Sequence, residues 1–307
     1  MMEGIVMKST GSWYQVLVGN QLYACRLRGK FKIKGLKVTN PIAVGDRVVL
    51  EIEDPQEGTG VITDIVPRKN YIIRQSTRKA YHGHIIAANL DQAILVATLV
   101  FPRTSMGFID RFLVSAESFR IPAVVVFNKA DLLSEELRAL QEELMELYES
   151  IGYRCLAISA LSEASVPPVQ RVITGKVSLF SGHSGVGKST LLNQISTELT
   201  QRTAEVSTFA NKGVHTTTYA EMFQTDPGTF VIDTPGIKEL GLMDVNDGEL
   251  SHYFPEMRAL LGECRFHNCI HTHEPGCAVR EAVAASTIDE GRYHSYLSML
   301  ENEDNRR

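Results

Sequence analysis

The chain has 307 residues, of which 44% are hydrophobic and 22% are charged. This is ordinary globular composition and argues against extensive disorder, and the length predicts two or three domains. No apolar run approaches the roughly 20 residues that a membrane-spanning helix needs. Residues 1–10 show no secretory signal, so we expect a cytoplasmic protein without a membrane partner.

Charge is distributed unevenly along the chain. Residues 1–85 contain 13 basic and 7 acidic residues, which gives +6, whereas residues 86–307 contain 18 and 29, which gives −11, and the two sum to the formal −5. A basic N-terminal part on an acidic body suggests that this part binds an anionic partner. Ordinary solvated surface charge is the alternative interpretation.

The sequence predicts a small β-barrel over residues 1–68. Short apolar stretches alternate with turn residues there, without a long helical period. Lys30, Lys32 and Lys34 alternate with apolar residues, which would place the three cations on one face of an extended strand. The basic stretch that follows is expected to form a linker over residues 69–85.

An α/β domain is expected over residues 86–243. Continuous apolar runs indicate strands of a parallel sheet covered on both faces, and apolar residues at helical spacing indicate amphipathic helices between them. This alternation predicts a doubly wound fold. The expected strands are 92–99, 123–127, 155–158, 177–180, 219–223 and 229–232, and the expected helices are 109–116 and 134–151.

A phosphate-binding loop is predicted between a strand and a helix, where the chain matches G-x-x-x-x-G-K-[ST]. The glycines allow backbone N–H groups to surround a phosphate. Lys188 would contact the β- and γ-phosphates, and the Ser189 hydroxyl would bind Mg²⁺. The nucleotide-binding residues predicted here are Gly182, His183, Ser184, Gly185, Val186, Gly187, Lys188, Ser189 and Thr190.

A D-x-x-G motif follows the predicted strand 229–232. Asp233 at the end of the strand can hold Mg²⁺ through water, and the Gly236 N–H can contact the γ-phosphate. Alone, this motif is usually a turn. Together with the phosphate-binding loop it indicates a nucleoside triphosphatase.

An N-K-x-D motif follows the predicted strand 123–127 and indicates selectivity for guanine. Guanine presents N1–H and an exocyclic amine side by side, and the Asp131 carboxylate can accept from both. Asn128 would brace the loop and Lys129 would pack over the base, while Ser159 and Ala160 would contact guanine O6 through their backbone. Taken alone, N-K-x-D would more often be a helix-capping turn.

The order of these motifs differs from that of common GTPases. Here the base-binding motifs at 128 and 159 precede the phosphate-binding loop at 182, whereas they usually follow it. The same sheet can close if its strands are joined elsewhere, so the order predicts a circular permutation. Residues after Gly236 are then joined directly to the segment that senses the γ-phosphate.

A small metal-binding domain is predicted over residues 244–307. Three thiols and one imidazole, from Cys264, Cys269, His271 and Cys277, can form a closed tetrahedral site for one structural Zn²⁺. Nearby histidines at 267 and 273 are the alternative imidazole ligands. Scattered core cysteines are the less favoured interpretation of the cluster.

Taken together, these features resemble the RsgA (YjeQ) family of GTPases that depend on the small ribosomal subunit. Besides the nucleotide motifs and the Cys/His cluster, the resemblance includes residues 28–30, 40–48, 67–70 and 109–113, and so covers nearly the whole chain. It implies an N-terminal OB-fold, GTP hydrolysis stimulated by the 30S subunit, binding to its 16S rRNA and a late role in its maturation.

The first switch of that family reads G-R-H-T-T-T, and this chain departs from it at Val214, which replaces the arginine. Any contact that the arginine makes is therefore in doubt. Thr217 is expected to be the Mg²⁺-linked threonine of the switch, with Thr216 and Thr218 as close competitors.

Ile237 occupies the position where many GTPases have the glutamine that orients the attacking water. An apolar side chain cannot do this, so intrinsic hydrolysis should be slow. His215 is the predicted catalytic substitute, because a neutral imidazole can accept a hydrogen bond from water. The alternative is that His215 packs the loop or contacts rRNA.

The sequence thus predicts a monomeric GTPase with three domains, which uses Mg²⁺ with GTP. The alternative is a GTP-gated RNA-binding protein in which hydrolysis is incidental. A small-molecule P-loop kinase is disfavoured, because that function explains neither Asp131 nor the Cys/His cluster.

Overall fold

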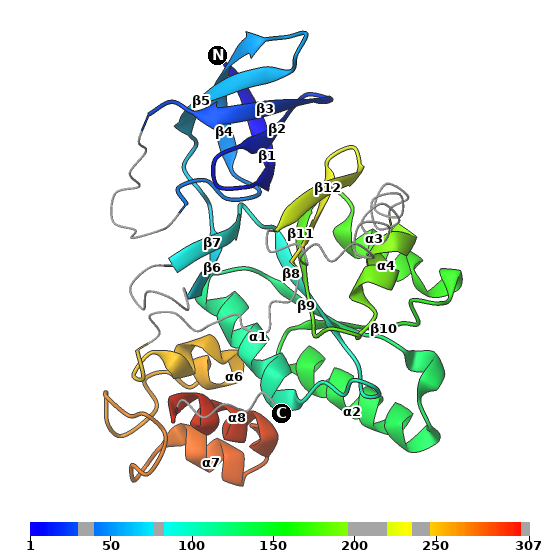
Figure 1. Cartoon of the computed structure of the whole chain (residues 1–307). Helices are drawn as coiled ribbons and strands as arrows, with labels where there is room; N and C mark the ends of the chain where they lie inside the picture. The colour runs from blue at the N-terminus through cyan, green and yellow to red at the C-terminus, as the bar shows by residue number, and fades with distance from the viewer. Residues whose placement is uncertain (30–39, 76–82, 196–219, 235–245, 302–307) are drawn as a thin grey trace.

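The computed structural model describes residues 1–29, 40–75, 83–195, 220–234 and 246–301. Figure 1 shows a β-barrel from the first part of the chain, a central α/β domain and a helical domain from the last part. Several residues singled out above lie outside the described residues. They are Lys30, Lys32, Lys34, Val214, His215, Thr216, Thr217, Thr218, Gly236 and Ile237.

Five strands form the N-terminal barrel in the order β1-β2-β3-β5-β4, and β4 returns to pair with β1, which closes the sheet. Each strand contributes a buried side chain to the interior, for example Val6, Tyr14, Cys25, Leu50 and Ile62. The predicted OB-type barrel is therefore confirmed. The strands are β1 (Met2–Ser9), β2 (Tyr14–Val18), β3 (Gln21–Leu27), β4 (Arg47–Asp54) and β5 (Thr59–Ile65).

The segment expected as a basic linker contains regular structure. Strands β6 (Tyr71–Gln75) and β7 (Gly83–Ala88) pair antiparallel in a separate two-stranded sheet. Val44, just before β4, forms an isolated parallel bridge with Ala87 in β7. The barrel is thus attached to the linker by backbone hydrogen bonding as well as by the chain itself.

A buried ion pair fixes the exit from the barrel. Arg68 donates from Nε and Nη2 to the two carboxylate oxygens of Asp46, each at 2.6 Å, and from Nη2 to Pro41 O at 2.7 Å. The Asp46 side chain is fully buried, and such a charge is tolerated when a bidentate partner compensates it.

The central domain contains the predicted doubly wound sheet, with strand order β10-β9-β8-β11-β13-β12. Neighbouring strands are parallel except β12, which is antiparallel to β13. At its far edge, β12 pairs with β1 of the barrel at Lys8 and Glu221, whose side chains form a 3.3 Å ion pair. The strands are β8 (Gln92–Ala97), β9 (Ala123–Phe127), β10 (Arg154–Ala157), β11 (Val177–Ser181), β12 (Glu221–Asp226) and β13 (Thr229–Asp233).

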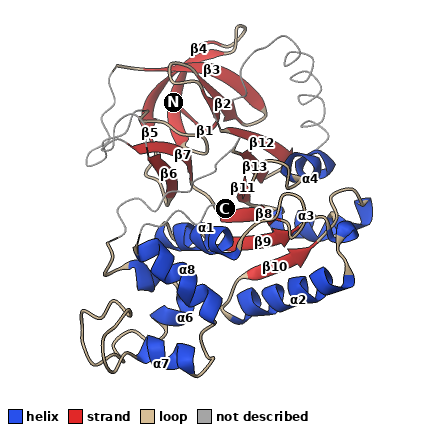
Figure 2. Cartoon of the chain, turned by 60° about the horizontal axis from the view of Figure 1, so that its bottom comes forward, coloured by secondary structure: helices blue, strands red, loops and turns tan. Residues whose placement is uncertain are grey.

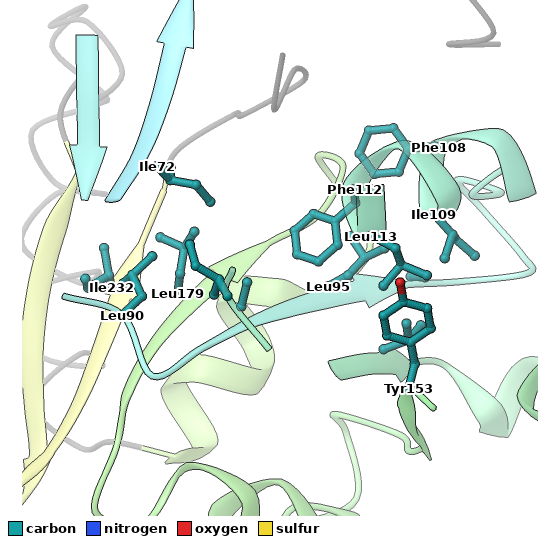
Figure 3. Close-up of a cluster of buried hydrophobic side chains, with 14 of the residues drawn as sticks. Ile72, Leu90, Leu95, Phe108, Ile109, Phe112, Leu113, Tyr153, Leu179 and Ile232 are labelled. Atoms are coloured by element: carbon teal, nitrogen blue, oxygen red, sulfur yellow. The ribbon is translucent and has the colours of Figure 1, made fainter. Parts of the chain in front are cut away.

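Helices cover both faces of this sheet. Figure 3 shows Phe112 and Leu113 of one helix packed near Leu95 of β8. The neighbouring strand residues 94 and 96 face the other side, where they pack against the third and fourth helices. The helices are α1 (Met106–Ser118) and α2 (Glu135–Ser150) on the first face, and α3 (Pro167–Ile173) and α4 (Lys188–Ile195) on the second, with 3-10 turns η1 (Ala130–Leu132) and η2 (Glu163–Ser165).

The two longer helices begin where the sequence provides a serine cap. The side chain of Ser105 accepts a hydrogen bond from Phe108 N, and that of Ser134 accepts one from Leu137 N. Each cap satisfies an N–H group that has no partner within its helix. The predicted start of α2 at Ser134 is therefore confirmed.

The last part of the chain packs short helices around its own apolar core, which includes Phe254, Met257 and Tyr296 and is completed by Val114 from α1. In the described part of the chain, no helix has the length and apolarity to cross a membrane. The elements are η3 (Leu250–Tyr253), α6 (Pro255–Arg258), α7 (Ala278–Ala284) and α8 (Glu290–Leu300).

Gly45 is expected to be essential for joining the barrel to β7. Its φ is +86°, and a Cβ atom there would lie 2.2 Å from the carbonyl oxygen of Ala88. Gly45→Ala should lower the free energy of unfolding by more than about 3 kcal/mol, because strain and a backbone clash add.

Gly11→Ala is the matched control, since its φ is +89° and nothing lies within 4 Å of the added Cβ. This control should lose about 1–2 kcal/mol, the cost of the left-handed conformation. Urea denaturation of both variants measures the difference. Equal losses would show that the backbone at Ala88 moves aside without cost.

Candidate functional site

The candidate site lies where the direction of the sheet connections reverses. On one side of β8 the sheet continues with β9 and then β10. On its other side lies β11, followed in the sheet by β13 and β12. In such sheets the loops beyond the carboxyl ends of the central strands diverge and leave a crevice for ligands. All the described nucleotide motifs follow strands that end at this edge (Figure 2).

Glycines allow the loop between β11 and α4 to approach its neighbours closely. Gly182 has φ +154°, and a Cβ there would lie 2.5 Å from Val96 O. Gly187 has φ +91°, and a Cβ there would lie 2.3 Å from the side-chain nitrogen of Asn128. Any other residue at these two positions would push the loop away from β8 and from the loop after β9.

Asn128 connects this loop to the two predicted base-binding loops. Its Nδ2 donates to Val186 O at 2.8 Å, and its Oδ1 accepts from Ala160 N at 2.8 Å. The residue is almost fully buried. These are the contacts of a residue that braces the site, which is the role expected for Asn128 from the sequence.

Lys129 adopts a left-handed conformation (φ +64°), and its ammonium group lies over the phosphate-binding loop. Its Nζ donates to Gly185 O at 2.7 Å and to Phe101 O at 2.5 Å. The exposed loop after β8 also packs Pro102 against Gly185. No sequence motif marks this loop, although its place after the central strand β8 is where ligand-binding loops occur in such sheets.

Asp131 lies exposed in η1, beside the loop after β10. The turn is anchored by a 3.0 Å hydrogen bond from Ala130 N to Ile158 O. Ser159 and Ala160 follow at once and are buried. The carboxylate is therefore presented to solvent from a fixed backbone, next to the two residues predicted to contact the same base.

Lys188 and Asp233 meet at the other side of the site. Lys188 begins α4, Asp233 ends β13, and the Lys188 ammonium forms an ion pair with the Asp233 carboxylate. Thr234 donates to Phe180 O at 2.8 Å, which holds the end of β13 against β11. Ser189, the predicted Mg²⁺ ligand, follows Lys188 in the first turn of α4 and is exposed.

Thr190 is the next residue of α4, while Ser184 precedes Gly185 in the same loop. His183 contacts α1, where its ring packs against that of Phe108 in a tilted arrangement with 3.8 Å between the ring centroids. The loop is thus supported by α1 as well as by Asn128.

A second cluster, of three cysteines and one histidine, lies in the C-terminal domain. The three sulfur atoms each lie 3.4–3.6 Å from the Nδ1 atom of the histidine. These are the distances from His271 Nδ1 to the Sγ atoms of Cys264, Cys269 and Cys277, and the four ligand atoms all lie within 4.8 Å of one another. A tetrahedral ion with metal–sulfur and metal–nitrogen bonds of about 2.3 and 2.0 Å requires a separation of about 3.5 Å. The described geometry therefore fits a metal ion.

The loop that carries the cluster is held by its own hydrogen bonds and by α8. Glu274 accepts from the N–H groups of Ile270, Thr272 and His273 at 2.8–3.1 Å, and these bonds lower the pKa of its carboxyl to about 2 although desolvation opposes them. Tyr293 donates to His271 O at 2.6 Å. These bonds help to orient the loop that carries the cluster.

Electrostatics also favours an ion among these groups. Desolvation lowers the pKa of His271, which favours the neutral imidazole that metals bind. Desolvation and the neighbouring thiols raise the pKa of Cys269 to about 12. Thiolates packed this closely repel one another, and a divalent cation removes that repulsion.

Comparison with known proteins agrees with this arrangement. A model of the RsgA GTPase family matches residues 65–243, and a model of the RsgA N-terminal domain matches residues 3–61. A protein of Cytophaga hutchinsonii named small ribosomal subunit biogenesis GTPase RsgA is 52% identical over 307 residues, which are 100% of both chains. Its namesake in Bacteroides fragilis YCH46 is 51% identical over 304 residues, 99% of this chain and 97% of its own.

Solved structures show the same architecture. YjeQ from Thermotoga maritima superposes with a TM-score of 0.78 at 36% identity, covering 100% of this chain and 99% of its own. YloQ, described as a circularly permuted GTPase, gives a TM-score of 0.77 at 29% identity, covering 100% and 96%. The permutation predicted from the motif order is thus confirmed, and the chain belongs to the RsgA family of GTPases.

Proposed function

We propose that this GTPase acts late in maturation of the small ribosomal subunit, and that the 30S particle stimulates its hydrolysis of GTP. The names of the curated relatives support the ribosomal role. The observation that carries the nucleotide chemistry is Asn128, which joins three loops at one edge of the sheet. We further propose that the protein works as a cytoplasmic monomer and that its basic barrel contacts 16S rRNA.

Guanine is selected by Asp131 in this proposal. The carboxylate accepts from N1–H and from the exocyclic amine, Lys129 covers the base with its aliphatic chain, and the backbone of Ser159 and Ala160 approaches O6. Adenine offers no pair of adjacent donors, so it leaves the carboxylate unsatisfied.

The triphosphate occupies the loop from Gly182 to Thr190. Lys188, now paired with Asp233, would turn to the β- and γ-phosphates, while Ser189 and Asp233 would bind Mg²⁺, directly and through water respectively. When phosphate replaces the Asp233 carboxylate as its partner, the partly buried Lys188 ammonium remains paired. Thr217 and Gly236 would complete the Mg²⁺ and γ-phosphate contacts.

The metal in the C-terminal cluster is proposed to be one structural Zn²⁺, held by Cys264, Cys269, His271 and Cys277. Three thiolates and one imidazole suit Zn²⁺ and leave no open position for chemistry. The ion would order a loop that has little apolar core of its own.

Asp131→Asn should raise the Kd for GTP at least about tenfold, because two hydrogen bonds to a charged acceptor are lost, each worth about 1.5–3 kcal/mol. Xanthosine triphosphate should now bind better than GTP, since its C2 oxygen accepts from the new amide. Titration with fluorescent nucleotides measures both affinities. Glu136→Gln, an exposed carboxylate in the first turn of α2, is the control, and unchanged GTP affinity in Asp131→Asn would falsify the assignment.

His215→Ala should retain binding of GTP and 30S particles but lose about 100-fold of the stimulated rate, the magnitude typical of a lost general base. Lys188→Ala should instead lose both intrinsic and stimulated turnover, because phosphate charge is no longer stabilised. Single-turnover hydrolysis with and without 30S particles separates the two effects. Stimulated turnover at the parental rate in His215→Ala would mean that rRNA or another residue orients the water.

Purified protein should contain about one Zn²⁺ per chain. Cys269→Ser should lose the metal and loosen the C-terminal domain while nucleotide still binds. Cys155→Ser, a buried thiol of β10 outside the cluster, should keep the metal. Mass spectrometry of metal content measures this, and stoichiometric metal in a Cys264/Cys277 double variant would exclude the proposed ligands.

A further inference from the structure

Helix α1 lies between the central sheet and the C-terminal domain (Figures 1 and 2). One face, with Phe112 and Leu113, packs in the core of the sheet. Another stripe carries Met106, Asp110 and Val114, spaced four residues apart as on a single helix face. Val114 belongs to the apolar core of the C-terminal domain, so α1 is shared by both domains.

A buried group of charges joins this stripe to the C-terminal domain. Arg292 of α8 donates from Nη1 to Asp110 at 2.7 Å, and from Nε and Nη2 to Glu256 of α6 at 2.8 and 3.1 Å. Tyr148 of α2 also donates to Asp110, at 2.9 Å. Asp110 and Arg292 have no exposed surface, and the guanidinium lies 4.7 Å from the centre of the Phe254 ring.

This triad, Asp110–Arg292–Glu256, fixes geometry more than it adds stability. An apolar trio of similar volume would hold the helices about as well, whereas removal of Arg292 leaves two carboxylates buried and uncompensated. A guanidinium bonded to two carboxylates has one orientation. The triad therefore sets the position of α1 relative to α6 and α8.

The same helix supports the phosphate-binding loop at its first turn. Phe108, two residues before Asp110, packs its ring against His183 of that loop with 3.8 Å between ring centroids. Met106, in the same first turn of α1, lies against Gly291 of α8. A Cβ atom added to Gly291 would come within 3.2 Å of Met106 Cε. A displacement of α8 would therefore move the residues that support the loop.

We propose that Asp110, Arg292 and Glu256 are positioning residues that couple nucleotide binding energetically to the C-terminal domain. They belong neither to the nucleotide motifs nor to the Cys/His cluster, and they act through α1 and its Phe108 contact with the loop. The inference rests on the proposed nucleotide site. Such coupling is reciprocal, so nucleotide must also stabilise the packing of α8.

The parental protein provides the first test. Hydrogen exchange of amides in α8 is compared without nucleotide and with saturating GDP, with strands β2 and β3 of the barrel as an internal reference. GDP should slow exchange in α8 several-fold, because opening of α8 would disturb the loop that holds GDP. Unchanged exchange in α8, with GDP bound, would overturn the proposal.

Arg292→Gln and Asp110→Asn provide the second test. Each should raise the Kd for GDP at least about fivefold, within the range typical of allosteric coupling, and should abolish the effect of GDP on α8. Arg292→Lys, which retains the charge, should fall between Arg292→Gln and the parent.

The matched control is Arg258→Gln. Arg258 of α6 pairs with Glu117 of α1 at 2.8 Å, so it bridges the same two helices, but its side chain is 47% exposed. An exposed pair contributes little, and the Kd for GDP should stay within about twofold of the parent.

The outcomes separate this inference from the proposed function. A parent that fails to bind GDP would refute the nucleotide site itself. Parental GDP affinity in folded Arg292→Gln would refute the coupling alone, as would an equal loss in Arg258→Gln. If Arg292→Gln does not fold, Arg292→Lys, Asp110→Asn and the exchange experiment on the parent still decide the matter.

Discussion

The side chain of Asn128 occupies the point where three segments of the chain meet. It donates to the loop after β11 and accepts from the loop after β10, while the residue itself follows β9. A buried amide needs partners for both its nitrogen and its oxygen, so these two bonds define one arrangement of the three loops. Gly187 is part of the same constraint, because a side chain there would occupy the space of the Asn128 amide.

Because the loops are positioned by the sheet, the order in which the chain visits them is free to change. Permutation places the barrel before β8 and the C-terminal domain after β13. The barrel pairs with β12 at Lys8 and Glu221, and the C-terminal domain packs on α1. Both added domains therefore contact elements that lead directly to the nucleotide motifs.

Much of this arrangement could be predicted from the sequence, because its signals are local. The apolar strands, the Ser134 cap and the glycine-rich loop can each be recognised from a few neighbouring residues. The cluster from Cys264 to Cys277 can be recognised from the spacing of its residues alone. The strands β6 and β7 were hidden by the basic composition of residues 67–80, which indicated a linker. Their backbones nevertheless pair antiparallel, and buried Ile72 and Ile86 pack in the core of the sheet.

Contacts between distant residues gave no such signal. Asp110 and Arg292 are 182 positions apart, and a single arginine in a helix with other polar residues resembles any solvated side chain. Lys129 was expected to cover a base, but its bonds to Gly185 and Phe101 depend on how two loops approach each other. The periodicity of apolar residues predicts which face of a helix or strand is buried. It does not predict which charged side chains will form an ion pair.

Helix α8 shows why a charged group is suited to this interface. Tyr293 and Tyr296 donate to the carbonyls of His271 and Ile270, so the helix holds the loop of the Cys/His cluster. On the same helix, Arg292 holds α1. Apolar packing tolerates sliding and rotation of helices, because dispersion contacts are individually weak and non-directional. A forked guanidinium between two carboxylates does not tolerate such sliding. A metal ion that ordered the loop would therefore restrict α8, and α8 would in turn restrict the helix on which the phosphate-binding loop rests.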